Sequence, residues 1–170
     1  YEASWGPLVM DPRRGAEVLL RELTLRVRES YDDLLAATRD ADVLLSHPIT
    51  FAAPLVAAVT GVRWASAVLA PLSLYSLADD MPVVLPAIAG WRAAWPAAHR
   101  AVLRLGQRIS RRWVAPVDAL RRALGLPPGG HPVFEGQHAP ALVLALFSPL
   151  LAAPQSDWPP QTLVTGAVVD

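Results

Sequence analysis

The side chains with the clearest capacity for chemistry follow two short apolar runs. Ser46, His47 and Pro48 come directly after the first run, and Ser73 and Tyr75 follow the second within a few residues. A histidine at the end of a strand can hydrogen-bond nearby backbone, or it can contact a ligand at the edge of a sheet. The serine and the tyrosine can orient a ligand, or they can be ordinary polar loop residues. The residue types leave both interpretations open.

The sequence signatures of familiar catalytic and metal sites are missing. The chain has no P-loop, no nucleophile elbow, no G-x-G-x-x-G turn and no H-E-x-x-H zinc motif. The four histidines lie far apart in the sequence, and the absence of cysteine excludes disulfides and thiolate ligands. Asp79 and Asp80 could coordinate a metal, although adjacent loop carboxylates are usually solvated. No motif therefore marks a catalytic residue, and we expect no metal site in this chain.

The two apolar runs predict neighbouring strands of a parallel sheet. Val43–Leu45 is short and ends abruptly, as buried parallel strands do. Phe51–Thr60 has helical spacing, and Gly61 follows it where a left-handed cap is common. Val62–Leu69 is the second aliphatic run, which Pro71 ends. A strand, a helix and a second strand imply a right-handed crossover, and ligands bind beyond the carboxyl ends of such strands.

Other segments continue the alternation of helices and strands. Apolar spacing predicts helices at Arg13–Arg39, at Trp95–Arg112 and, after a break at Pro116, at Val117–Leu124. Further strands are predicted at Ala141–Phe147 and Thr162–Val164. The pattern indicates a single α/β domain over residues 1–170, with an open parallel sheet.

Two segments have features suited to contacts with other molecules. Leu74–Pro86 is long for a simple connector, which favours a functional loop. The helix predicted at Trp95–Arg112 has an arginine stripe beside an apolar face, formed by Arg100, Arg104, Arg108, Arg111 and Arg112 and by Val102, Leu105, Ile109 and Trp113. Such a stripe can meet anionic lipid, although it is more often the solvated side of an amphipathic helix.

Composition narrows the class of protein. The 170 residues are 53% hydrophobic with zero formal net charge, which suits one globular core and gives no argument for nucleic-acid binding. The mean hydropathy of +0.32 is high and suggests apolar surface intended for a partner. No stretch has the roughly 18–20 apolar residues of a membrane span. The start, Tyr-Glu-Ala-Ser-Trp, reads as the middle of a longer protein.

Several tracts resemble the acceptor-binding half of bacterial GT-B glycosyltransferases. The similarity is to the UDP-glycosyltransferase and family 28 type, grouped with sterol, macrolide and rhamnolipid glycosyltransferases. It covers about three-quarters of the chain and is carried by residues 41–48 (Ala-Asp-Val-Leu-Leu-Ser-His-Pro), 68–73 (Val-Leu-Ala-Pro-Leu-Ser), 121–128 (Arg-Arg-Ala-Leu-Gly-Leu-Pro-Pro), 144–149 (Leu-Ala-Leu-Phe-Ser-Pro), 154–159 (Pro-Gln-Ser-Asp-Trp-Pro) and 164–166 (Val-Thr-Gly). The order and spacing of these tracts make the match specific.

The resemblance implies a partial Rossmann-like lobe that acts together with segments outside this chain. The family's catalytic base would precede Tyr1, and a second lobe holding a UDP- or dTDP-linked sugar would follow Asp170. The parent enzyme would transfer a hexosyl group, with inversion, to a hydroxyl of a hydrophobic acceptor such as a sterol, polyketide or lipid. This chain would hold no cofactor and would be inactive alone. Its location would be cytoplasmic, with contact to a membrane surface as a further option.

The expected acceptor site lies at the carboxyl ends of the first two strands. Its residues are His47, Phe51, Pro71, Leu72, Ser73, Tyr75 and Met81. The apolar members would hold the acceptor, and His47 or Ser73 would orient its hydroxyl. Two alternatives belong to different classes: a stand-alone, non-catalytic α/β module that binds a small molecule or a protein, and an inactive truncated product.

Overall fold

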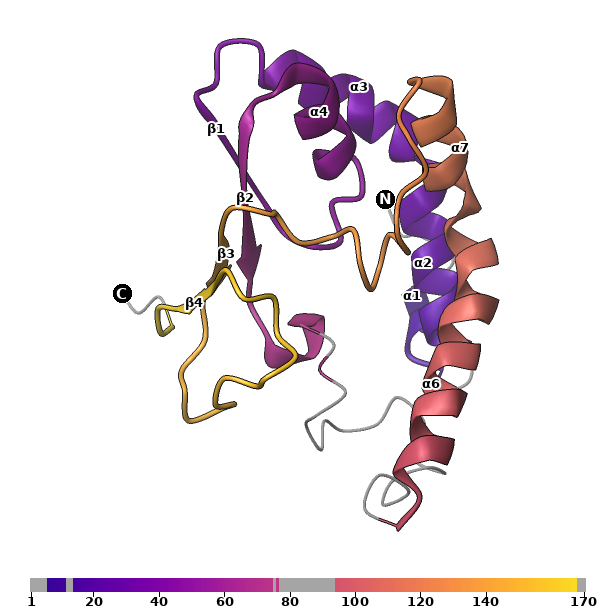
Figure 1. Ribbon diagram of the computed structural model, residues 1–170. Helices are drawn as coiled ribbons and strands as arrows, with labels where there is room; N and C mark the ends of the chain where they lie inside the picture. The colour runs from indigo at the N-terminus through magenta and orange to yellow at the C-terminus, as the bar shows by residue number, and fades with distance from the viewer. Residues whose placement is uncertain (1–5, 12–13, 75, 77–93, 168–170) are drawn as a thin grey trace.

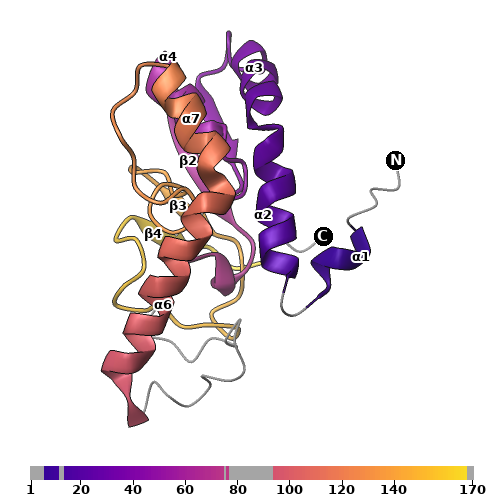
Figure 2. The ribbon, with the colours of Figure 1, turned by 90° about the vertical axis from the view of Figure 1, so that its right-hand side faces the viewer.

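The computed structural model describes residues 6–11, 14–74, 76 and 94–167. Four strands form one sheet in the order β1-β2-β3-β4, and every neighbouring pair is parallel. The described helices lie together on one side of this sheet (Figures 1 and 2). The molecule has an open, Rossmann-like α/β fold, and the predicted fold class is confirmed.

The first crossover forms as the sequence predicts. Strand β1 (Val43–Ser46) leads into helix α4 (Ala53–Thr60), and strand β2 (Arg63–Val68) lies beside β1 with Ser46 opposite Ser66. Gly61 ends α4 with a φ of 74°, in the left-handed region that glycine adopts without a Cβ clash. Strands β3 (Val143–Ala145) and β4 (Thr162–Val164) complete the sheet. The bounds of β4 match the prediction, whereas β3 is shorter than predicted.

The prediction of a single helix over Arg13–Arg39 is wrong, because two shorter helices, Gly15–Leu25 and Val27–Ala37, occupy this region. Helix α1 (Gly6–Val9) precedes α2 (Gly15–Leu25) and α3 (Val27–Ala37), and the chain leaves helical geometry at Arg26, with φ −101° and ψ 16°. Thr24 is fully buried, and its hydroxyl lies 2.7 Å from the Leu20 carbonyl and 3.1 Å from the Trp113 carbonyl. A threonine that bonds back to the preceding turn bends a helix, and here a distant carbonyl adds a tertiary partner.

The break predicted at Pro116 is present, with bounds that differ from the prediction. Helix α6 (Pro96–Ser110) passes into a 3₁₀ turn, η3 (Arg111–Val114), and α7 (Ala115–Ala123) begins one residue before Pro116. Proline is tolerated there because the first-turn amides of a helix have no intrahelical acceptor. Among the helices of the described ranges, none combines the length and hydropathy needed to cross a lipid bilayer.

Two apolar clusters form the core on the helical side of the sheet. One joins α3, α4 and α7 through Val27, Tyr31, Phe51, Leu55, Val56, Val117 and Leu120. The other joins the sheet to the segments that follow its strands, through Val68, Leu74, Val143, Ala145, Phe147 and Trp158. Burial of this kind supplies about 25 cal/mol per Å² of apolar surface.

The opposite face of the sheet is apolar and open. Val43, Leu45 and Leu163 lie on it, and each is more than half exposed. No described helix covers this face (Figure 1). Parallel sheets are usually covered on both faces, so these side chains form a surface suited to a further partner.

Candidate functional site

The carboxyl end of β1 is tied to β2 by a side-chain bond. Trp64 donates its indole N–H to the Ser46 hydroxyl oxygen at 2.9 Å, and Ser46 itself is buried. His47 follows on a half-buried position, where its Nδ1 accepts the Ile49 N–H at 3.4 Å. Burial lowers the pKa of His47, so the ring is neutral near pH 7. The remaining ring nitrogen can then serve as a hydrogen-bonding group.

The segment after β2 turns back over the helical side of the sheet. Residues Pro71–Leu74 form a 3₁₀ turn, η1, and Leu74 enters the core cluster that contains Val68. Pro71 and Ser73 are half-buried, whereas Leu72 remains exposed. Among the described residues, no hydrogen bond joins His47 to Ser73. The paired strands thus lie side by side as predicted, while the polar groups at their ends have separate surroundings.

The side chain of Phe51 belongs to the hydrophobic core. It is 5% exposed and packs with Val27, Tyr31 and Leu55 in the cluster between α3, α4 and α7. So little exposed ring surface leaves almost nothing for an acceptor to contact. Tyr75 and Met81, and most of the predicted loop Leu74–Pro86, lie outside the described residues.

A half-buried histidine that sequence reasoning missed lies against Ser73. His138 is half-buried, and desolvation lowers its pKa, while a hydrogen bond with the Ser73 backbone acts in the opposite direction. The Gln137 amide nitrogen lies 3.2 Å from the His138 Nε2, and the Gln137 side chain is almost fully buried. The donor and acceptor roles in this contact depend on the tautomer of the His138 ring.

The same segment is anchored to the middle of the sheet. Ser66, fully buried on β2, accepts the Ala139 N–H at 2.8 Å and lies 3.4 Å from the Gln137 carbonyl. The Gln161 side chain donates to the Ala139 carbonyl at 2.7 Å. These bonds hold residues 137–139 in place. Among the described residues, Nδ1 of His138 and Oε1 of Gln137 are buried without a hydrogen-bond partner, so two polar atoms of this segment are unsatisfied.

The segments that follow β2 and β3 meet the segment that leads into β4. Phe147 packs edge-on against Trp158, with ring centroids 6.0 Å apart, and both belong to one core cluster with Val68 and Leu74. Ser76 donates its hydroxyl to Asp157 at 2.6 Å, which ties the end of η1 to the segment that carries Trp158. The rim at this end of the sheet is apolar and exposed, with Ile49, Leu69, Leu72, Leu150 and Leu151.

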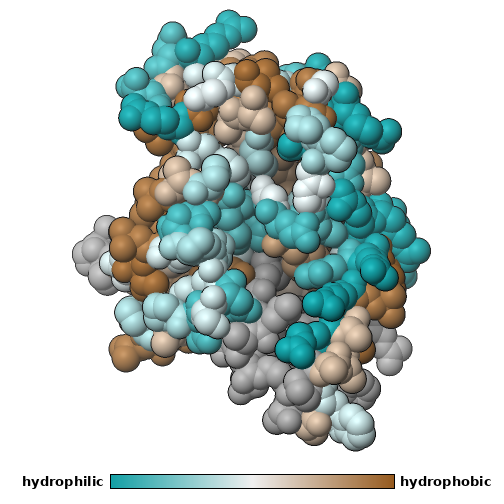
Figure 3. Space-filling view, viewed as in Figure 1, coloured by the Kyte–Doolittle hydropathy of each residue, from teal (hydrophilic) through white to brown (hydrophobic). Residues whose placement is uncertain are grey.

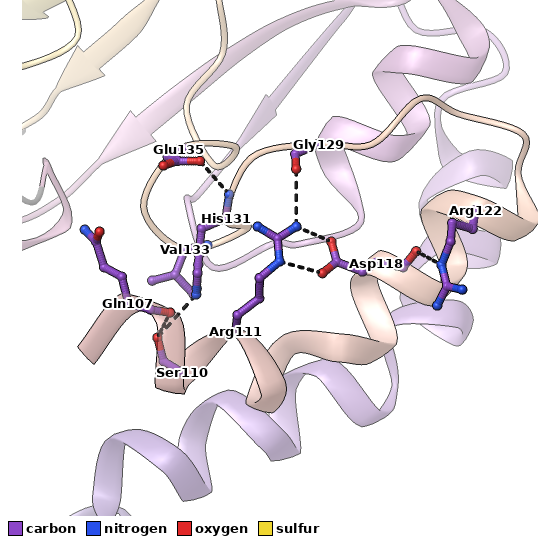
Figure 4. A network of polar contacts seen from close by, with 9 residues as sticks. All are labelled: Gln107, Ser110, Arg111, Asp118, Arg122, Gly129, His131, Val133 and Glu135. Carbon is purple, nitrogen blue, oxygen red and sulfur yellow. Dashed lines mark hydrogen bonds and ion pairs between the residues drawn. The ribbon is translucent and has the colours of Figure 1, made fainter. Parts of the chain in front are cut away.

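A second histidine pairs with a serine at the end of α6 (Figure 4). His131 is buried, and its Nε2 lies 3.2 Å from the Ser110 hydroxyl oxygen, as a nucleophile and its base would. Val133, however, donates its N–H to Nδ1 at 3.2 Å. A neutral ring with Nδ1 as acceptor carries its proton on Nε2, and therefore cannot take the proton of Ser110. Ser110 instead donates to the Gln107 carbonyl at 3.0 Å, so the pair serves the structure.

The surface has two shallow hollows away from the predicted site. One, of about 490 Å³, lies at the amino end of the sheet and is lined by residues that include Leu35, Arg39 and Gly61. The other, of about 450 Å³, lies over α3 and includes Glu29 and Asp33. Neither is lined by a predicted acceptor residue. In the described ranges, His, Asp and Glu do not gather in a group that could hold a metal ion.

Comparison of this chain with protein-family models and with curated proteins found no match. The polar group of Ser73, Gln137 and His138, with its exposed apolar rim, is the candidate functional site. Its arrangement suits the binding of a molecule with an apolar body and a hydroxyl or other small polar group. Only Ser73 of these three was predicted. His138 lies in a loop of ordinary composition, and no local pattern in the sequence marks it.

Proposed function

We propose that this chain is the acceptor-binding part of a nucleotide-sugar-dependent glycosyltransferase. The observation that carries the proposal is the convergence of resembling tracts: residues from 68–73, 144–149, 154–159 and 164–166 contribute to one cluster around Val68, Phe147 and Trp158. Tracts that lie far apart in the chain and still meet at the carboxyl side of a parallel sheet are what a shared binding site requires. The exposed apolar rim supports a hydrophobic acceptor.

The role proposed for this chain is positioning. The acceptor's apolar body would lie on the rim, and Ser73, His138 or His47 would accept or donate a hydrogen bond at its hydroxyl. In the complete enzyme a base would take the hydroxyl proton as the oxygen attacks the anomeric carbon. The bond from that carbon to the nucleoside diphosphate breaks, and the diphosphate leaves with inversion. Orientation of the hydroxyl lowers the barrier because it removes motional freedom before the reaction.

The base and the site for the UDP- or dTDP-linked sugar are assigned to segments outside these 170 residues. The isolated chain is therefore expected to bind acceptors without transferring sugar. The test is calorimetric titration of the purified chain with a sterol, a macrolide aglycone and a 3-hydroxy fatty acid, followed by incubation of each with nucleotide sugars. Acceptor binding without glycoside formation supports the proposal. Glycoside above a heat-treated control, or tight binding of the nucleotide sugar alone, contradicts it.

The open face of the sheet favours a second candidate, a stand-alone module that binds another protein. Val43, Leu45 and Leu163 give this face an exposed apolar surface without a described covering helix. A protein-binding module would bind none of the three hydrophobic alcohols. The same titrations therefore separate the two candidates.

A further inference from the structure

Helix α6 concentrates positive charge that has no partner in the rest of the described protein. Arg100, Arg104 and Arg108 repeat every four residues along Pro96–Ser110, and this helix contains no Asp or Glu. All three are exposed, and no described carboxylate pairs with them. Several arginines elsewhere do have ion pairs: Arg21 with Glu17, Arg28 with Asp32 and Arg111 with Asp118. The whole chain has zero net charge, so the charge on α6 is a local feature.

An exposed apolar stripe runs beside the arginines. Leu105 is 56% exposed and Ile109 is 42% exposed, and each follows an arginine of the stripe by one residue. One residue is a rotation of about 100° around a helix, and a spacing of four keeps side chains on one face. The two stripes therefore lie next to each other along the same stretch of α6. Trp95, 68% exposed, lies immediately before the first turn.

The position of α6 leaves these side chains accessible. Both ribbon views show α6 at the outer side of the helical layer, with its N-terminal end extending beyond the other described elements (Figures 1 and 2). In the space-filling view, hydrophilic and hydrophobic atoms lie side by side at the lower right, where α6 runs (Figure 3).

We propose that α6 docks the protein on an anionic membrane surface. The arginines would contact lipid phosphates, while Leu105, Ile109 and Trp95 would enter the boundary between headgroups and acyl chains. Helices that lie in this boundary combine a basic polar face with Leu, Ile or Trp on the adjoining face. Tryptophan is enriched at headgroup level, and long basic side chains reach the phosphates while their stems stay in apolar surroundings.

A lipid surface fits this helix better than a protein groove. Leu105 and Ile109 are only partly exposed and form a narrow stripe, which suits shallow insertion and provides little area for a protein interface. Three regularly spaced arginines can each contact a phosphate of an anionic membrane, because the lipid headgroups are mobile. Each basic residue near such a surface strengthens binding about fivefold. The docking helix is also separate from Ser73 and His138, so vesicle binding and acceptor binding can be lost independently.

The test is co-sedimentation of the purified chain with two kinds of vesicle, pure phosphatidylcholine and phosphatidylcholine containing one-quarter phosphatidylglycerol. Binding to the anionic vesicles is expected, with much weaker binding to the neutral ones. It should also weaken as salt rises, because the screening length falls from about 10 Å at 0.1 M to about 3 Å at 1 M. Equal binding to both vesicles, or no binding to either, would overturn the proposal.

Two variants of α6 separate its two stripes. Arg100→Ala, Arg104→Ala and Arg108→Ala together should weaken binding to the anionic vesicles on the order of 100-fold. Leu105→Gln with Ile109→Gln should also weaken binding while leaving the charge unchanged. The matched control is Arg14→Ala, Arg39→Ala and Arg63→Ala, which removes three exposed arginines from other elements.

Circular dichroism spectra should show that all variants keep the helical content of the parent chain. If the control loses as much vesicle binding as the α6 triple variant, the effect belongs to net charge, and the proposal fails. The membrane proposal would also be overturned if the protein bound polyglutamate saturably but bound neither kind of vesicle. That result would indicate an acidic protein partner.

Discussion

Val133 donates its backbone N–H to Nδ1 of His131 at 3.2 Å, and this bond determines the tautomer of a buried histidine. His131 also organises its own turn: its N–H donates to Glu135 at 2.8 Å (Figure 4). Its carbonyl accepts N–H groups from Phe134, Glu135 and Gly136. A protonated ring would carry a hydrogen on Nδ1, facing the Val133 donor. The turn therefore requires neutral His131.

This requirement predicts that the protein loses stability in mild acid. Burial and Arg111 lower the pKa of His131 below its ordinary value of 6.5, against opposing effects of Glu135, Asp118 and the Gln107 backbone; burial also lowers the pKa values of His47 and His138. A lowered folded-state pKa means that the unfolded chain binds more protons, so the free energy of unfolding falls as the pH drops below 6.5. Above pH 6.5 these three histidines should make no further change to the free energy of unfolding.

Urea unfolding at a series of pH values between 5 and 8 measures this effect. His131→Gln, which keeps a polar side chain without titration, should reduce the slope of stability against pH and lower stability at pH 7.5. A parent chain whose unfolding midpoint is the same at pH 5 and pH 7.5 would show that the three histidines do not control its stability.

Ser66→Ala should destabilise the protein through the segment that carries His138. The substitution removes the acceptor of the buried Ala139 N–H, and an unpaired buried donor costs about 1–3 kcal/mol. The measurement is the free energy of unfolding in urea. Ser30→Ala on the exposed side of α3 is the control and should change stability by less than about 0.5 kcal/mol. Equal effects of the two substitutions would contradict the anchoring role of Ser66.

Phe51 and Ser73 should give opposite results when substituted. Phe51→Ala opens a cavity in the α3–α4–α7 cluster and should cost about 3–5 kcal/mol of stability, with unchanged acceptor affinity in the folded fraction. Ser73→Ala and His138→Ala should lower acceptor affinity several-fold at a smaller cost in stability, and His47→Ala tests the other strand end. These outcomes are measured by urea unfolding and by calorimetric titration of a bound hydrophobic alcohol. Wild-type affinity in all three polar variants would place the acceptor elsewhere.

The open face of the sheet should cause self-association. Val43, Leu45 and Leu163 are exposed, and β1 is an edge strand whose outer side has no described strand beside it. Sedimentation velocity at increasing protein concentration should show dimers or larger species, and the protein should bind the dye ANS. Leu45→Glu should shift the population towards monomer, whereas Val59→Glu, at an exposed position of α4, should not. A monomer at all concentrations, with no ANS binding, would count against this expectation.

Local pattern in the sequence was sufficient for the first crossover. The abrupt end of the apolar run at Ser46, the helical spacing before Gly61 and the β-branched run up to Val68 are short-range features, and the structure has a strand, a helix and a strand there. The alternation of elements also indicated the parallel sheet, because parallel neighbours need a crossover between them. Likewise, the break at Pro116 follows from the missing amide of a proline.

Tertiary contacts decided the rest. Helix α2 ends just after Thr24, whose buried hydroxyl lies 3.1 Å from the carbonyl of Trp113, 89 residues away in the sequence. Phe51 had the apolar character expected of a ligand contact, yet its place against α3 and α7 puts it in the core. The proximity of His138 to Ser73, and the exposure of Leu105 and Ile109 beside Arg104 and Arg108, likewise depend on how distant segments pack. Periodicity reports which side of an element is apolar, whereas only the folded chain determines what, if anything, covers that side.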